Sequence, residues 1–316
     1  MPTTILAQGL CKQFGATVAV DQLDLEIAQG EIFGFLGHNG AGKTTTVRLL
    51  NGVLERNAGS IAVLGMDPNK DGAKIRARTG VLTETPALDD RLTARATLRY
   101  FAAMFGVPRE RINRGVDELL ERMDLGARGD EKVGGFSKGM RQRLALARTL
   151  LHAPELVFLD EPTSGLDPVG AREVHQLIAT LRRENRTVFL CTHNLVEAER
   201  LCDRMAILAH GKVLAMGTLT ELAGQLKYGH RTRFEVAPEQ ADAAIQALQR
   251  VWPAMQVDLL EERAFAGVAT VLHVHGGGRE QVAQMVGLLS AAEVLLYRVE
   301  PDEPSLEAVY FQLEHT

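Results

Sequence analysis

A glycine-rich segment at residues 37–44 constrains the fold of this chain more than any other part of the sequence. It reads GHNGAGKT and fits the phosphate-loop pattern G-x-x-x-x-G-K-[ST]. The apolar run at residues 31–36 predicts a short buried strand before the loop, and residues 44–50 predict the first turns of a helix after it. A loop of this pattern between a strand and a helix predicts a site for the phosphates of a nucleotide.

The chemistry of a phosphate site assigns roles within this loop. Glycines let backbone N–H groups curve around phosphate oxygens, and the helix N-terminus adds a partial positive charge at the same place. We expect Lys43 to reach the outer phosphates and Thr44 to offer its hydroxyl to Mg²⁺. The residues expected to contact the nucleotide are Gly37, His38, Asn39, Gly40, Ala41, Gly42, Lys43, Thr44 and Thr45.

Length and composition narrow the class of protein. A chain of 316 residues is long enough for two domains, since roughly 100–200 residues is usual for each. The net charge of −5 provides no overall basic surface for nucleic acid. Three widely spaced cysteines without a C-x-x-C pair disfavour a disulfide framework or a zinc site and suit a reducing cytosol. No signal peptide is predicted, and no apolar run approaches the ~18 residues of a membrane helix, so any membrane role is expected to come through a partner.

The order of strand and helix patterns predicts an α/β domain over residues 1–226. Residues 156–159 and 187–192 are continuous apolar runs of the kind that buried parallel strands show. Strand patterns alternate with helix patterns around them, which implies a mostly parallel sheet covered on both faces. Two short strands are expected within residues 4–27, where apolar and polar residues alternate, and a closing hairpin at residues 205–216.

Two amphipathic helices are predicted between these strands. Thr93 is a plausible N-cap, and Leu98, Phe101, Ala102 and Phe105 then fall on one face. Residues 112–123 show a second apolar stripe of the same kind. Both stripes are expected to be core faces.

The pattern changes near Leu226, where residues 228–231 are expected to form a linker. From Arg231 the predicted order is strand, helix, strand, strand, helix, strand, as in ferredoxin-like folds. A final helix is expected after Pro304. Residues 231–316 are therefore predicted to form a small α+β accessory domain.

Two acids follow the apolar run at residues 156–159. A buried strand that ends in Asp160 and Glu161 puts two carboxylates at the carboxyl edge of the sheet, where doubly wound folds bind ligands. Asp160 is expected to help hold Mg²⁺, through water, and Glu161 to polarise the attacking water as general base. The alternative is a strand that merely ends in acids, and the neighbouring phosphate loop favours the chemical role.

A second anion-binding helix terminus is predicted near residue 137. Ser137 begins a helical pattern that runs to about His152, and Gly139 follows it by two residues. Backbone N–H groups at such a start can hold phosphate oxygens. A plain N-cap is the alternative explanation for the serine.

These segments together resemble the ATP-binding subunits of ABC transporters. The phosphate loop matches the Walker A motif of that family, and residues 156–161 match Walker B. Residues 136–140 resemble the LSGGQ signature, and residues 164–167 match the D-loop. The motifs keep the order and spacing of the family over about residues 3–222.

The resemblance also assigns single residues. It implies that Phe14 stacks on adenine, that Asp167 of the D-loop senses the partner site, and that His193 is the switch histidine. Phe14 as an ordinary core residue and His193 as a cap of the next helix stay open as alternatives. The resemblance implies the fold of a P-loop ABC ATPase, with a mostly parallel sheet, an antiparallel N-terminal subdomain and a helical signature subdomain.

Two positions depart from the family pattern. Lys138 stands where the signature has glycine, and it either adds a phosphate contact or faces solvent. Glu84 stands where the family has the Q-loop glutamine, and it is expected to reach the metal with Thr44 and Asp160. The tail at residues 302–313 resembles that of ATP-binding subunits from drug, antibiotic-resistance and sodium exporters, which carry a small C-terminal domain.

The function implied by the resemblance is that of an energy-coupling ATPase of a multidrug-type membrane exporter. Its cofactors are ATP and Mg²⁺, and ATP closes a head-to-tail homodimer in which Ser137 and Gly139 of one subunit complete the site of the other. A separate membrane permease is expected to dock on the segment from Glu84 through the helix at residues 98–105. The subunit would then lie on the cytoplasmic face of the cell membrane and bind no nucleic acid.

Two other functions deserve comparison. A soluble ABC ATPase acting on ribosomes or DNA is disfavoured, because the chain has one cassette and no sustained heptads for a coiled coil. A nucleotide-regulated binding module, with a C-terminal domain that senses a ligand, is the third possibility. No residue identifies the transported substrate.

Overall fold

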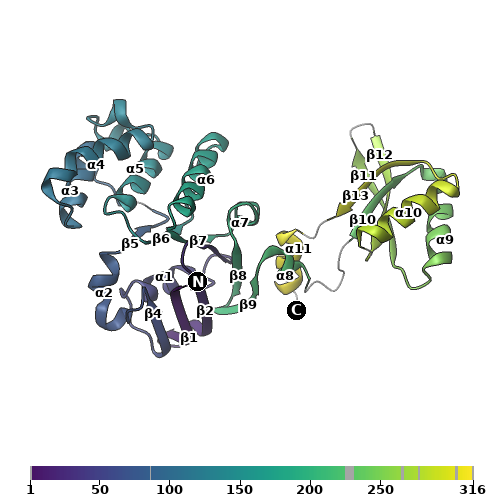
Figure 1. Cartoon of the computed structure of the whole chain (residues 1–316), viewed down its shortest axis with the longest axis horizontal. Helices are drawn as coiled ribbons and strands as arrows, with labels where there is room; N and C mark the ends of the chain where they lie inside the picture. Colours follow the sequence, from purple (N-terminus) through teal and green to yellow (C-terminus); the bar gives the residue numbers. More distant parts are fainter. Residues whose placement is uncertain are drawn as a thin grey trace. The chain divides into compact units, whose positions relative to one another are not determined.

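A computed structural model describes residues 2–85, 87–224, 231–264, 267–276, 278–302 and 305–314. The chain divides into two compact units, residues 1–219 and 220–316 (Figure 1). Residues 228–230 of the predicted linker lie outside the described residues, as does Pro304 before the last helix. Across the part of the chain that is described, no helix combines the length and apolar character needed to cross a membrane.

A six-stranded sheet forms the centre of the first unit, in the order β5-β6-β7-β3-β8-β9. The first five strands in this order run parallel, and β9 pairs antiparallel with β8, which confirms the predicted mostly parallel sheet and its closing hairpin. The strands are β3 (Ile32–Leu36), β5 (Thr79–Leu82), β6 (Leu156–Asp160), β7 (Thr187–Thr192), β8 (Arg204–Ala209) and β9 (Lys212–Gly217).

Alternate side chains of the central strands enter two separate apolar cores. Phe158 and Phe189 pack with Phe35 on one face of the sheet, whereas Leu159 and Leu190 belong to the cluster on the other face. Every residue of β3, β6 and β7 is buried as a result. This explains why these strands appear in the sequence as continuous apolar runs and not as alternating ones.

A second, antiparallel sheet is built from β1 (Thr3–Phe14), β2 (Thr17–Ala28) and β4 (Ala58–Val63), in the order β2-β1-β4. The two strands predicted to be short are each 12 residues long. Their pairing shifts register at several points, including between Ala7 and Leu10. Such bulges interrupt the period-2 pattern without ending the strand, so the sequence pattern understates its length.

The helices of the first unit cover the parallel sheet and form a separate helical region between β5 and β6. Thr93 and Ser137 act as N-caps, since their hydroxyls accept hydrogen bonds from the N–H groups of Ala96 and Met140. The helices are α1 (Lys43–Leu50), α2 (Pro68–Arg76), α3 (Ala94–Met104), α4 (Arg109–Arg122), α5 (Lys138–Leu150), α6 (Pro168–Arg183) and α7 (Leu195–Leu201), with the short α8 (Leu219–Ala223) at the boundary of the two units.

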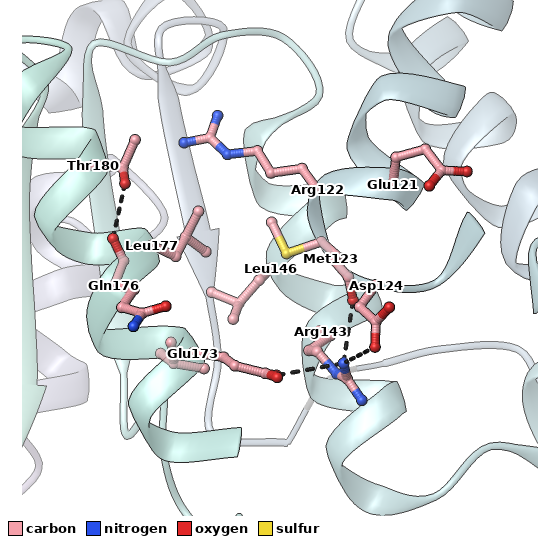
Figure 2. Close-up of a pocket in the computed structure, with 11 residues that line it drawn as sticks. Glu121, Arg122, Met123, Asp124, Arg143, Leu146, Glu173, Gln176, Leu177 and Thr180 are labelled. Carbon is pink, nitrogen blue, oxygen red and sulfur yellow. Dashed lines mark hydrogen bonds and ion pairs between the residues drawn. The ribbon is translucent and has the colours of Figure 1, made fainter. Parts of the chain in front are cut away.

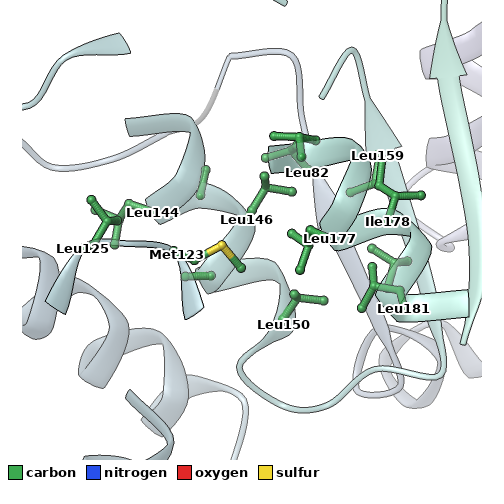
Figure 3. Close-up of a cluster of buried hydrophobic side chains, with 14 of the residues drawn as sticks. Leu82, Met123, Leu125, Leu144, Leu146, Leu150, Leu159, Leu177, Ile178 and Leu181 are labelled. Atoms are coloured by element: carbon green, nitrogen blue, oxygen red, sulfur yellow. The ribbon is translucent and has the colours of Figure 1, made fainter. Parts of the chain in front are cut away.

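Leucine side chains join the helical region to the sheet. Figure 3 shows Leu146 and Leu150 of α5 beside Leu177 of α6, in the same buried cluster as Leu82 and Leu159 of the sheet. This packing holds α5, whose first turn carries the signature segment, against α6, whose first turn follows the D-loop. The positions of these two helix starts are therefore set by one shared core.

Phe105 was predicted to belong to the core face of the helix at residues 98–105, and for this residue the prediction is wrong. Leu98 and Ala102 are buried as expected, but α3 ends at Met104 and Phe105 is 37% exposed. Its ring stacks on that of His152, with 4.1 Å between the centroids. The helix stops one residue before the apolar stripe does, so the last side chain of the stripe leaves the core.

The second unit has the predicted element order β-α-β-β-α-β, followed by α11 (Leu306–Glu314). Its sheet is antiparallel, in the order β11-β12-β10-β13, and Phe234, Leu272 and Met285 are fully buried in one apolar cluster. The elements are β10 (Arg231–Val236), a 3-10 turn (Pro238–Gln240), α9 (Ala241–Val251), β11 (Val257–Ala264), β12 (Gly267–His275), α10 (Arg279–Ala291) and β13 (Leu296–Asp302).

Candidate active site

The phosphate loop joins β3 to α1 and lines a pocket of about 140 Å³. Gly42 has φ +108°, and a Cβ there would lie 2.4 Å from the carbonyl oxygen of Ala19, so only glycine fits. Gly37 and Ala41 lie inside the loop, where Ala41 is fully buried. The residues that line the pocket are Ala19, His38, Asn39, Gly40, Gly42, Lys43, Thr44, Thr45, Glu84, Asp160 and Glu161.

Lys43 places a buried ammonium group beside this pocket. Its Nζ donates to the carbonyl oxygens of Gly37 at 2.5 Å and His38 at 3.3 Å, and lies 4.0 Å from Oε1 of Glu161. The lysine side chain is only 7% exposed. A buried cation needs such partners, because burying an unpaired charge costs several kcal/mol or more.

Three oxygen-bearing side chains, those of Thr44, Asp160 and Glu84, line the same pocket. Thr44 Oγ1 donates to Oδ2 of Asp160 at 3.1 Å, and Glu84, in the loop after β5, lines the same pocket. Burial raises the pKa of Asp160, and the charges of Glu161 and Glu84 raise it further, whereas the hydrogen bond from Thr44 and the charge of Lys43 lower it. Oxygen ligands and excess negative charge are what a Mg²⁺ ion prefers, so this group of residues fits that metal.

Glu161 and His193 are in direct contact. Oε1 of Glu161 accepts hydrogen bonds from the backbone N–H of His193 at 3.0 Å and from its Nδ1 at 2.8 Å. Glu161 is buried and has φ +49°, a left-handed conformation that is uncommon outside glycine and is found at functional sites. The His193 ring is 62% exposed, so it bridges the buried carboxylate and the surface.

The signature segment (residues 136–140) and the D-loop (residues 164–167) lie together and apart from the phosphate pocket. A Cβ on Gly165 would lie 1.7 Å from Nζ of Lys138, so the lysine side chain crosses the D-loop glycine, whose φ is +66°. Asp167 Oδ1 accepts from the N–H of Gly170 at 2.7 Å and caps α6. Ser137, Gly139 and Asp167 are absent from the lining of the phosphate pocket.

Phe14 lies at the end of β1 and is not a core residue. Its side chain is 48% exposed, and the ammonium of Lys12 lies 5.0 Å from the ring centroid. The ring is outside the lining of the phosphate pocket. It therefore presents an aromatic face at the surface, as an adenine platform needs.

Sequence analysis missed a buried polar network next to this site. Glu197 on α7 is 2% exposed and accepts hydrogen bonds from Thr163, His175 and Thr192. The available signal was a capping box, since Asn194 stands three residues before Glu197. Only half of that motif forms. The side chain of Asn194 accepts a hydrogen bond from the N–H of Glu197. The N–H of Asn194 donates to Thr192 and not to the carboxylate of Glu197, so that carboxylate accepts hydrogen bonds from other residues.

A second pocket, of about 290 Å³, lies between the end of α4 and helices α5 and α6. Figure 2 shows Arg143 of α5 with its guanidinium between Asp124 and Glu173, at 3.3 and 3.4 Å. The same group reaches the carbonyl oxygen of Met123 at 3.5 Å. Arg143 thus ties the signature helix to its two neighbouring helices, at a place where sequence analysis predicted no functional residue.

Comparison with known proteins identifies the class of this site. A sequence model of the ABC transporter family matches residues 20–164. The daunorubicin resistance ATP-binding protein DrrA3 of Streptomyces coeruleorubidus is 43% identical over 71% of this chain and 71% of its own length. The uncharacterized ABC transporter ATP-binding protein YhcH of Bacillus subtilis is 35% identical over 99% of this chain and 96% of its own. A solved structure of an ATP-binding subunit of an ABC transporter, 30% identical, superposes with a TM-score of 0.66 and covers 71% of this chain and 93% of that one.

The fold and the phosphate pocket define a P-loop ATPase. The chain belongs to the family of ABC transporter ATP-binding subunits. The predicted fold class, the ATP-binding function and the ATPase activity are confirmed by these relationships. The match to YhcH extends through the second unit as well as the first.

Proposed function

We propose that this protein is the energy-coupling subunit of a membrane exporter of drug or antibiotic type, and that ATP-dependent dimer closure drives efflux through a separate permease. The observation that carries the proposal is the 43% identity to a protein named for resistance to daunorubicin, over the unit that holds the ATPase site. Resistance to a cytotoxic compound follows when that compound is removed from the cell, so an ATPase of this kind is best explained by export.

The residues of the phosphate pocket support binding of Mg²⁺ and of the phosphates of ATP. Lys43 and the backbone of the phosphate loop would hold the phosphates, and Phe14 would support the adenine. Thr44, Asp160 and Glu84 would hold Mg²⁺. The ion, when bound, would neutralise charge on the phosphate oxygens.

The catalytic proton transfer is assigned to Glu161. Its carboxylate is buried beside Lys43 and is oriented by two hydrogen bonds from His193. In this position it would accept the proton of the attacking water, and His193 would orient the water and contact the outer phosphate. The strained backbone at Glu161 supports this role, because such strain persists where the surrounding structure holds it for function.

The second half of the ATP site is assigned to a second copy of the chain. Ser137 and Gly139 stand at the N-terminus of α5, where free N–H groups and the helix dipole favour an anion, and they are remote from the phosphate pocket of their own chain. Asp167 caps the helix that follows the D-loop and would sense the partner's site. A head-to-tail homodimer would bring the two halves together.

The permease is proposed to dock on the segment from Glu84 to α3. Tyr100 and Met104 of α3 are 59% and 64% exposed, and Phe105 is partly exposed beside them. Exposed apolar side chains close together mark protein contact sites. Through this contact the subunit would lie on the cytoplasmic face of the membrane, with residues 231–316 as an accessory domain to the ATPase domain at residues 1–226.

Glu161→Gln tests the proposal. We expect turnover of the purified protein to fall by roughly 10²–10⁴-fold while ATP binding survives, because the amide cannot accept the proton.

The variant should sediment as a dimer at saturating Mg-ATP and as a monomer with ADP, and co-expression with its membrane partner should recover a complex. Unchanged turnover would refute Glu161 as base, and a monomer under Mg-ATP with the permease present would refute the dimer. Co-purification with ribosomes or DNA would favour the non-transport alternative.

A further inference from the structure

A tight turn joins Glu161 to the D-loop. The N–H of Ser164 donates to the carbonyl oxygen of Glu161 at 3.1 Å, which closes a four-residue turn over residues 161–164. Pro162 is the second residue of this turn, a position that the fixed φ of proline favours. The N–H of Glu161 donates to the carbonyl oxygen of Cys191 at 2.9 Å, so β7 holds the start of the turn.

A side chain of the signature helix holds the middle of this turn. Nε2 of Gln142, on α5, donates to the carbonyl oxygen of Pro162 at 2.8 Å. Both residues are buried, and Gln142 is only 6% exposed, so the carbonyl depends on this donor and not on water. The orientation of the peptide group after Pro162 is therefore set by α5, whose first turn carries the signature segment.

The third residue of the turn is held by a different helix. Thr163 Oγ1 donates to Oε1 of Glu197, on α7, at 2.9 Å. Glu197 is buried and also accepts from Thr192, at the end of β7, at 2.9 Å. The two central residues of the turn are thus fixed by hydrogen bonds to α5 and α7.

The backbone of Glu161 needs such support. Its φ of +49° is a left-handed conformation that costs free energy in a residue with a side chain, and it persists only where the surrounding structure holds it. In this conformation Oε1 of Glu161 accepts from Nδ1 of His193 at 2.8 Å and lines the phosphate pocket. A change in the backbone at Glu161 would move the carboxylate out of that position.

We propose that Gln142 is a positioning residue for the catalytic base. Its hydrogen bond to Pro162, together with that of Thr163 to Glu197, holds the turn and so keeps the carboxylate of Glu161 at the ATP site. This role rests on the proposed function of Glu161 as the base. Gln142 is absent from the lining of the phosphate pocket and acts through the turn. The helix that begins at the signature segment therefore also supports the base of its own chain.

Gln142→Met tests the proposal in the full chain, because methionine is similar in length and has no N–H to donate. We expect kcat to fall by about 10- to 100-fold, since a displacement of about 1 Å in a catalytic group can cost that much. The Kd for Mg-ATP should not change, because the phosphate loop is untouched. Steady-state turnover and titration calorimetry measure the two quantities, and a wild-type kcat would overturn the proposal.

Thr149→Val is the matched control for this variant. Thr149 is buried on the same helix, about two turns after Gln142, and its hydroxyl donates to the carbonyl oxygen of Ala145 at 2.9 Å. The change removes a buried hydrogen bond of α5 away from the turn, so kcat should stay at the wild-type value. An equal loss of kcat in the control would mean that any weakening of α5 lowers turnover, and would overturn the specific role of Gln142.

Thr163 variants test the same turn even where Gln142→Met does not fold. Thr163→Val removes the hydroxyl that donates to Glu197, so kcat should fall while the Kd for Mg-ATP stays constant. Thr163→Ser keeps the hydroxyl and should recover most of the turnover. A purely structural role would lower the unfolding temperature of Thr163→Val and leave its kcat unchanged, which would refute the positioning of Glu161 by this turn.

Glu161→Gln, measured in the same assay, separates the role of Glu161 from that of Gln142. If Glu161→Gln hydrolyses ATP at the wild-type rate, Glu161 is not the base and the role of Gln142 fails with it. If its turnover falls, adding Gln142→Met should lower the residual turnover no further, because the group that Gln142 positions is already lost. A further fall of tenfold or more would leave Glu161 as the base and refute only its positioning by Gln142.

Discussion

The phosphate pocket and the signature segment are the two surfaces of this chain that we propose bind phosphate, and they are built in opposite ways. In the pocket, Lys43 and Glu161 are buried and satisfied by each other and by groups of the same chain. In the signature segment, Ser137 and Lys138 are exposed, and among the described contacts the hydroxyl accepts only the cap hydrogen bond of its own helix. The first surface is complete within the chain, and the second presents its donors outward.

This difference follows from the cost of burying charge. A buried ion must be paired and hydrogen-bonded, so each charged group of the pocket depends on its neighbours. An exposed helix terminus needs no partner, because water satisfies its N–H groups. Loss of the buried lysine that would hold the phosphates should therefore damage nucleotide binding itself, whereas substitutions in the signature segment should leave binding intact and affect turnover.

The largest effect on binding is expected for Lys43→Ala. The change removes the phosphate-facing cation and leaves Glu161 buried without it. The Kd for Mg-ATP should rise by about 10- to 100-fold, since hydrogen bonds from a charged group contribute about 1.5–3 kcal/mol. A nucleotide titration by calorimetry measures it, with Lys74→Ala as the control, because Lys74 forms an exposed ion pair with Asp71. An unaltered Kd would contradict the role of Lys43.

A smaller and different effect is expected for Ser137→Ala. Turnover should fall by about tenfold, the effect of one lost hydrogen bond to a charged phosphate, while the Kd for Mg-ATP stays constant. Loss of the N-cap should also lower the free energy of unfolding by about 1 kcal/mol. Thr93→Ala is a matched control, because Thr93 caps α3 in the same way and should cost the same stability without lost turnover. Equal turnover losses in the two variants would mean that the serine is a cap and nothing more.

The smallest effect is expected for Arg143→Gln, which loosens the signature helix at the pocket in Figure 2. Its partner Asp124 is 90% exposed, and such ion pairs contribute about 0–1 kcal/mol, so both stability and turnover should change little. Thermal unfolding and steady-state turnover measure it, against Arg114→Gln in the exposed pair with Glu118. A tenfold loss of turnover at unchanged stability would instead show that this pocket takes part in function.

The sequence pattern could group the residues that line the phosphate pocket because their positions follow local rules. Thr44 lies in the first turn of a helix, Asp160 ends a strand and His193 directly follows one. Parallel strands bring their carboxyl ends to one edge of the sheet. Turn geometry at Gly42 is equally local, since it depends on the conformation of single residues. Spacing along the chain therefore carries enough information to group these residues.

The parts that the sequence did not predict depend on contacts between distant segments. The placement of Lys138 across Gly165 requires α5 and α6 to pack side by side. The length of β1 and β2 was hidden by bulges, and Phe105 leaves the core because α3 ends one residue early. Each of these outcomes depends on how a segment packs against its neighbours in the fold, and the local sequence pattern does not predict that packing.

By itself, the sequence determined a phosphate-loop pattern between a strand and a helix, with acids at the end of a later strand, because turns, caps and strand ends are set by residues close in sequence. Only the tertiary structure decided that Thr163, His175 and Thr192 donate to Glu197, since these residues come from the segment before the D-loop, from α6 and from β7. A buried carboxylate takes whichever donors packing supplies.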